Sequence, residues 1–312
     1  MSVTRLADMA LILRRLQSGG MDVSQANVIY GSYTTLAIPV FSLIPALITP
    51  IALVSVPQLS AAIEGKDRMS QATVFERSVR WTVLLAMPAA MGIAVYASPI
   101  LSMLFSGERE AIAIAAPLLS VLGVSILFAS LITTTNALLQ AYRRTEAPIV
   151  SITVGAVIKI LSAYWLIGIP SVGVYGAPIS TFFCNLTVTV LNFVFLGRCV
   201  PKERHVGGVS RVYWKPLFSS VLSILASLAA YFPLRVWVDT EWISFFVAAA
   251  VAVAVYGAML LLLRCVTAEE LRMLPMGERL LDQRNQRKLK YKDGTKDDNR
   301  GENQISGGKT TL

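Results

Sequence analysis

Long apolar stretches, separated by short polar segments, dominate this chain. Each is longer than the roughly 20 residues that a helix needs to cross the hydrocarbon core of a bilayer. Their apolar character is continuous and does not alternate with a period of two, so it predicts helices and not the strands of a membrane barrel. The chain is therefore predicted to be an all-α, polytopic helical membrane protein. The predicted spans are 30–57, 80–105, 115–141, 148–169, 174–197, 214–237 and 241–265.

The two ends of the chain differ from this apolar interior. Residues 1–26 contain a helix stub too short to cross a membrane, followed by a turn-rich segment that is predicted to be an outer loop. Residues 267–312 are charged and hold almost no large apolar side chains. Such a segment buries too little surface to offset its ordering entropy, so a disordered basic tail is predicted there.

Charge indicates how the chain is oriented. The formal net charge is +9, and the basic residues concentrate in the tail and in the connections 60–80, 142–147 and 198–215. By the positive-inside rule these connections and the C-terminus are predicted to face the cytoplasm, in a multi-pass protein of the cell membrane. Arg14 and Arg15 fall on the predicted outer side and break this pattern. Contact with anionic membrane lipids explains the basic surplus better than nucleic acid, which is not expected as a partner.

Composition also narrows the chemistry. Only 15% of the residues are charged, against an average of about 25% in soluble domains. The chain has one histidine and three widely spaced cysteines, so no metal site, disulfide framework or cofactor is predicted. Since paired carboxylates and a nucleophile–base set are also missing from the pattern, an enzyme is not expected.

Several motifs point to a family. The first span holds four prolines, which kink a helix, between the segments RRLQSGG, YGSY and SVPQLS. Downstream come AMPAAMGIAVYASPILSMLFSG, TTTNALLQAYRRTEAP and GAVIKILSAYWLIGIPSVGVYGAPISTFFC. Over about residues 5–200 this pattern resembles the polysaccharide-transporter branch of the multidrug/oligosaccharidyl-lipid/polysaccharide flippase superfamily, with the stage V sporulation protein B group as the nearest likeness. One departure is Tyr142-Arg143, where the family often has a glycine before its arginine.

The resemblance implies a fold and a function. Members have two six-helix lobes that face each other across a central cavity, and the longer members carry two further helices. On this template residues 27–212 are the C-terminal lobe with five spans, and residues 213–266 are the two additional helices. The N-terminal lobe is expected to be missing from this chain, so a separately encoded lobe is a candidate partner. The implied function is translocation of a lipid-linked oligosaccharide or cell-wall precursor for polysaccharide or peptidoglycan synthesis.

Lys159 is the sharpest single signal in the chain. It lies near the middle of its span, roughly 16 Å from either membrane surface at 1.5 Å per residue. A charge at that depth costs at least about 2.5–3.5 kcal/mol, so it generally faces a cavity and has a partner. Lys159 is interpreted either as a contact for the pyrophosphate of the substrate or as a structural lysine bonded to neighbouring helices.

The other candidate residues are polar or helix-bending. Asn136 and Gln140 lie four residues apart on one helix face, and Asn185 belongs to a similar stripe on the next span but one. They are candidate sugar contacts, and the alternative is interhelical hydrogen bonding. Pro39, Pro45 and Pro50 are a candidate hinge, and the alternative is a static kink.

Two other functions remain open at this point. A multidrug-type efflux carrier is disfavoured by a midplane lysine without a membrane-embedded carboxylate, because cation carriers rely on acidic groups. A non-transporting membrane scaffold, or the remnant of a split gene, is favoured by the missing lobe.

Overall fold

The computed structural model describes residues 9, 12–15, 22–105, 107–169, 171–201, 215–237 and 241–262. All regular structure within these residues is helical. Six helical runs there are long and apolar enough to cross a membrane: Val23–Glu64, Arg68–Val95, Arg109–Ala141, Glu146–Ile167, Gly173–Cys199 and Ile243–Leu260. The predicted all-α, polytopic membrane fold is therefore confirmed. The predicted tail, 267–312, lies outside the described residues.

The first span is longer than the sequence pattern predicted. Helix α2 (Val23–Ser32), the π-helical segment η1 (Tyr33–Ala37) and helix α3 (Ile38–Glu64) follow one another without a break. The outer loop is predicted to reach residue 26, which is wrong because helix α2 already begins at Val23. Asp22 caps this helix by accepting a hydrogen bond from the Ser24 amide at 3.2 Å.

The predicted connection 60–80 is also wrong. The chain turns within Gly65–Asp67, and helix α4 (Arg68–Val95) begins directly afterwards. Asp67 caps α4 by accepting hydrogen bonds from the Ser70 amide (3.1 Å) and hydroxyl (2.6 Å), and these bonds hold the pKa of the Asp67 carboxyl below its usual value. The first three turns of α4 resemble a loop in the sequence because they carry Arg68, Glu76 and Arg77 and few large apolar residues.

The predicted span 80–105 is divided between two helices. Helix α4 ends at Val95, and the short helix α5 (Ala97–Leu104) follows after Tyr96. The chain continues with α6 (Arg109–Ala141), α7 (Glu146–Ile167), the 3₁₀ turn η2 (Gly173–Tyr175) and α8 (Gly176–Cys199). The last two described helices are α9 (Lys215–Trp237) and α10 (Glu241–Leu262). The predicted span 214–237 corresponds to α9, in which Pro216–Tyr231 is a shorter apolar stretch.

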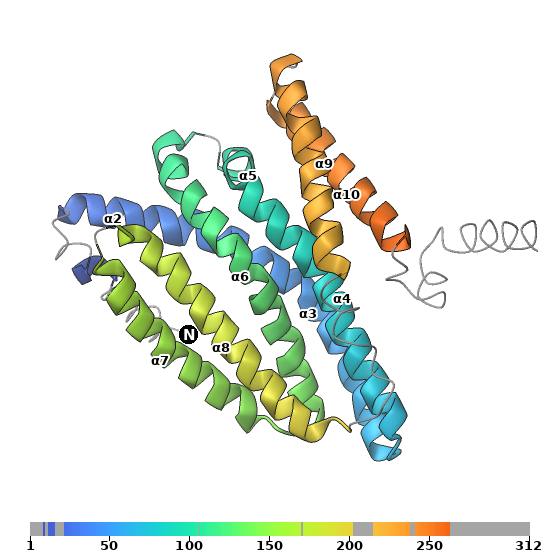
Figure 1. The fold of residues 1–312 in the computed structure, drawn as a ribbon. Coiled ribbons are helices and arrows are strands. Elements are labelled where there is room, and N and C mark those ends of the chain that lie inside the picture. The colour runs from blue at the N-terminus through green and yellow to red at the C-terminus, as the bar shows by residue number, and fades with distance from the viewer. Residues whose placement is uncertain are drawn as a thin grey trace, which may run out of the picture. The chain divides into compact units, whose positions relative to one another are not determined.

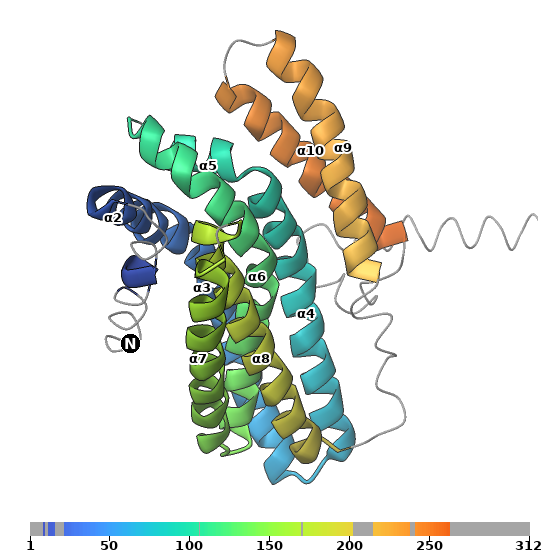
Figure 2. The ribbon, with the colours of Figure 1, turned by 60° about the vertical axis from the view of Figure 1, so that its left-hand side comes forward.

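Helix α6 is the central helix of the bundle. It packs against α3, α4 and α8, while α7 packs along α8 on the outside, as both views show (Figures 1 and 2). Two glycines allow these close approaches. A β-carbon at Gly123 of α6 would lie 2.8 Å from the Ala94 backbone of α4, and one at Gly155 of α7 would clash with the Val188 side chain of α8.

Apolar side chains fill both ends of the bundle. One buried cluster includes Leu36, Leu101 and Leu119, and a second, toward the α3–α4 turn, includes Leu59 and Leu138. Buried polar contacts also join the helices, such as Thr82 of α4 to Thr134 of α6 at 2.6 Å. Because a bilayer offers no water to these groups, such pairs satisfy hydroxyls that would otherwise be costly to bury.

Candidate functional site

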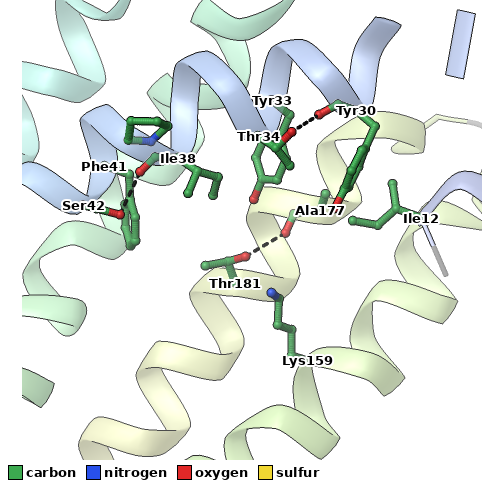
Figure 3. Close-up of a pocket in the computed structure, with 11 residues that line it drawn as sticks. Ile12, Tyr30, Tyr33, Thr34, Ile38, Phe41, Ser42, Lys159, Ala177 and Thr181 are labelled. Atoms are coloured by element: carbon green, nitrogen blue, oxygen red, sulfur yellow. Dashed lines mark hydrogen bonds between the residues drawn. The ribbon is translucent and has the colours of Figure 1, made fainter. Parts of the chain in front are cut away.

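A cavity of about 480 Å³ lies between the α2–η1–α3 run and helices α7 and α8 (Figure 3). Three of its walls come from segments far apart in the sequence, so only the folded bundle creates it. The lining residues are Ile12, Tyr30, Tyr33, Thr34, Ile38, Pro39, Phe41, Ser42, Lys159, Ala177 and Thr181.

Lys159 is half-buried on α7 and extends its ammonium group into this cavity, toward Thr181 of α8 (Figure 3). It is the one lysine, arginine or carboxylate among the lining residues that the structure describes. Lys159 thus lines a cavity in the structure, and its role as a substrate contact stays a prediction. A fixed positive charge within a mostly apolar wall attracts an anionic group strongly, because the low local dielectric weakens screening.

Hydroxyl groups surround the lysine. Thr34 donates to the Tyr30 carbonyl at 2.8 Å, Ser42 to the Ile38 carbonyl at 2.8 Å, and Thr181 to the Ala177 carbonyl at 3.1 Å. Each of these bonds uses the hydroxyl proton within the residue's own helix. The hydroxyl oxygens keep lone pairs that can accept hydrogen bonds from the hydroxyls of a ligand.

Two tyrosines complete the polar side of the cavity. Tyr30 of α2 and Tyr33 of η1 project from above toward the space that Lys159 enters from below (Figure 3). In the sequence these tyrosines belong to the family motif YGSY, which by itself assigns their side chains no role. Their spacing of three residues was the available signal, because it places both rings on one helix face.

The helix over the cavity is irregular. The π-helical segment η1 ends with the Ile38 amide bonded to the Tyr33 carbonyl, and the next residue is Pro39, which has no amide proton. Such π segments within α-helices are frequent at functional sites. Of the three candidate hinge prolines, Pro39 lines the cavity, whereas Pro45 and Pro50 lie within the continuous helix α3.

The amide side chains proposed as sugar contacts lie elsewhere. The Asn136 carbonyl oxygen on α6 accepts a hydrogen bond from the Asn192 amide of α8 at 2.8 Å, in a partly buried contact between helices. Gln140 is exposed near the end of α6, and Asn185 is half-buried on α8, one turn beyond Thr181. The structure thus brings Lys159 and Pro39 together at one cavity, but not Asn136, Gln140 or Asn185.

Arg15, which breaks the pattern of basic residues on the predicted cytoplasmic side, contacts Tyr164 near the end of α7. Its guanidinium lies 3.8 Å from the centre of the Tyr164 ring, and its Nε donates to the Tyr164 carbonyl at 3.3 Å. A cation over an aromatic face is stabilised by the ring quadrupole. Arg15 is thereby tied to the end of α7 and says little about the orientation of the chain.

Known proteins show the same architecture. Among solved structures, the fold is similar to that of a MOP superfamily transporter from Pyrococcus furiosus, with 15% identity and a TM-score of 0.52. The alignment covers 88% of this chain and 63% of the transporter chain. A second similar structure is an inward-facing multidrug resistance MATE family transporter, with 17% identity and a TM-score of 0.52. That alignment covers 88% of this chain and 58% of the transporter chain. At these identities the likeness concerns the fold alone.

Sequence comparison identifies the family. The chain is 28% identical over 282 residues to YabM, an uncharacterised membrane protein of Bacillus subtilis strain 168, and the match covers 87% of this chain. It spans 50% of the length of YabM. Residues 24–267 match the family described as lipid II flippase MurJ. The predicted flippase superfamily is therefore confirmed, and the chain belongs to the MurJ lipid II flippase family.

Proposed function

We propose that this chain forms one lobe of a carrier that flips a lipid-linked oligosaccharide or cell-wall precursor across the cell membrane. Family membership supports transport of a lipid-linked molecule. The observation that supports this class of substrate for this chain is the ammonium group of Lys159 inside a cavity lined by hydroxyls.

The two kinds of lining group suit the two parts of such a headgroup. The phosphate is anionic and would pair with Lys159, since hydrogen bonds between charged groups are about twice as strong as neutral ones. The sugar carries hydroxyls, which would bond to the side chains of Thr34, Ser42 and Thr181. A cavity of about 480 Å³ lies within the usual range for small-molecule sites.

Transport requires that the cavity open alternately to the two sides of the membrane. In many carriers this is a rocking motion of two lobes around a fixed site. The chain spans half the length of YabM, and we propose that a second lobe, in the same or a separate polypeptide, faces the cavity. We further propose that the junction of η1 and Pro39 is the hinge, because its backbone pairing is already incomplete there.

An efflux carrier for cations is the competing transport function, since the MATE structures share the fold. The described lining of the cavity holds a lysine and no carboxylate, which repels a cation instead of binding it. This charge favours an anionic substrate.

Binding to the purified chain in lipid nanodiscs tests the proposal. The probe is a fluorescent polyprenyl-diphosphate disaccharide, compared with the same lipid lacking its phosphates and sugar. Lys159→Ala is expected to weaken binding of the anionic probe roughly 10- to 100-fold, because a hydrogen bond to a charged group contributes about 1.5–3 kcal/mol. Lys159→Arg is expected to retain part of the affinity, as the charge is kept but the geometry changes.

Lys66→Ala is the matched control, because it removes one lysine charge from a turn outside the cavity. It should leave probe affinity unchanged. Equal affinity of the Lys159→Ala variant and the unmodified chain for the anionic probe would exclude the proposed phosphate contact.

A further inference from the structure

Pro88 lies inside helix α4, within the membrane-spanning run Arg68–Val95. In a regular helix the amide of residue 88 would donate to the carbonyl of Leu84, four residues earlier. Proline has no amide proton, so it cannot make this bond. A carbonyl without a donor is costly at membrane depth, where no water reaches it.

Another helix supplies the missing donor. The phenol hydroxyl of Tyr256 on α10 donates to the Leu84 carbonyl at 2.8 Å, across a separation of 172 residues. The carbonyl that Pro88 leaves without its helical partner is thus the one that Tyr256 binds. This bond forms only if Tyr256 lies at the level of the Leu84–Pro88 turn along α4. Apolar packing alone would not fix the position of α10 along α4 in this way.

A second hydroxyl contact joins the same elements at the end of α4. The Tyr96 hydroxyl lies 2.7 Å from the Ser227 hydroxyl of α9, and Ser227 donates in turn to the Ala248 carbonyl of α10 at 2.8 Å. Leu84 and Tyr96 are separated by about 18 Å at 1.5 Å per residue. The α9–α10 hairpin is therefore attached to α4 at two well-separated points.

The two attachments flank an apolar crevice. It has a volume of about 440 Å³ and is lined by α4, α9 and α10, with Leu84, Pro88, Tyr96, Ala249 and Tyr256 among its walls. The width of the crevice depends on how firmly the hairpin is held to α4.

We propose that Tyr256 and Pro88 form a latch, in which the Tyr256 hydroxyl replaces the amide that Pro88 lacks and fixes α10 to α4. The α9–α10 hairpin and α4 then move as one body, and the crevice keeps its width. This inference does not depend on the proposed substrate, because it rests on a backbone group of α4 and a hydroxyl of α10.

A double-mutant cycle on the full chain in detergent micelles tests the latch. In the presence of Pro88, Tyr256→Phe is expected to shift the unfolding equilibrium by about 3- to 18-fold, which runs from the average to the largest measured membrane hydrogen bond. In the Pro88→Ala background, the new amide of residue 88 can donate to the Leu84 carbonyl. The same Tyr256→Phe change should then shift the equilibrium less than about twofold, below the average measured effect of such a bond.

An equal effect of Tyr256→Phe in both backgrounds, or no effect in either, would overturn the latch. Tyr175→Phe is the control for losing a tyrosine hydroxyl, because Tyr175 is exposed in η2 and is not among the residues that line the crevice. It should leave the equilibrium unchanged.

A cysteine at Ala249, introduced after the native cysteines are removed, reports the width of the crevice. Its labelling rate by a membrane-soluble maleimide should rise at least threefold when Tyr256→Phe is added and should fall back when Pro88→Ala is combined with it. A labelling rate that does not respond to Tyr256→Phe would refute the claim that the latch sets the crevice width.

Discussion

Replacing Arg143 by glycine should stabilise the protein. Helix α6 ends in a Schellman motif, in which the Arg144 amide donates to the Leu139 carbonyl at 3.0 Å and the Arg143 amide to the Gln140 carbonyl at 2.9 Å. This motif requires a left-handed residue at position 143, and Arg143 indeed has φ of 58°. Glycine is the usual residue there because it has no β-carbon.

The expected gain follows from two opposing effects. A left-handed conformation costs an L-residue about 1–2 kcal/mol, and glycine removes that cost. Glycine also makes the unfolded chain more flexible, which takes back about 0.4–1 kcal/mol. The net gain should be about 1 kcal/mol, or roughly a fivefold shift of the unfolding equilibrium.

Arg144→Gly is the matched control. It removes the same charge from the next residue, but Arg144 is not among the described residues with a left-handed backbone. Denaturation in micelles should therefore show stabilisation for Arg143→Gly and none for Arg144→Gly. Lys66 at the end of α3 also has a left-handed backbone, with φ of 55°. Lys66→Gly should therefore stabilise the protein as Arg143→Gly does. Equal effects of the two arginine substitutions would mean that charge, and not backbone strain, decides stability at this turn.

Two further predictions concern packing and orientation. Gly123→Ala should destabilise the bundle by about 1–2 kcal/mol net, because its β-carbon would meet the Ala94 backbone at 2.8 Å and overpacking costs about 1–3 kcal/mol. Gly92→Ala, with nothing within 4 Å, should be neutral or stabilising in the same thermal melts, and similar losses for both would contradict the close-approach argument. For orientation, a cysteine at Thr145 in intact cells should resist an impermeant maleimide while one at Ser171 reacts. The reverse labelling would invert the proposed topology, including a cytoplasmic C-terminus.

The spans were predictable from sequence because the bilayer imposes a length and a composition on each of them. Their ends were less predictable. The first three turns of α4 carry charged residues, so their pattern resembles a loop, whereas the Asp67 cap and the turn at Gly65–Asp67 show that the helix starts at Arg68. Hydropathy reports how apolar a residue is, whereas a helix end is decided by hydrogen bonds to caps.

The Arg143 departure illustrates a different limit. The sequence showed that an arginine replaces the glycine of the family motif, but not why the family prefers glycine. The backbone angle supplies the reason, since the residue at this helix end must be left-handed. Burial of the neighbouring Tyr142 raises the pKa of its phenol to about 12, and Cys199 adds to this effect.

Polar residues within apolar spans either face a cavity or bond to another helix, and the sequence pattern does not distinguish these two positions. Asn136 and Lys159 both lie within apolar spans, and both could face either a cavity or another helix. An amide can satisfy its donors and acceptor against a neighbouring helix, as Asn136 does with Asn192 at 2.8 Å. A lysine carries three donors and a charge that are harder to bury, so it tends to face a polar cavity. In the structure Lys159 lines a cavity and Asn136 bonds to another helix, so charge is a better guide than an amide to which residue faces a cavity.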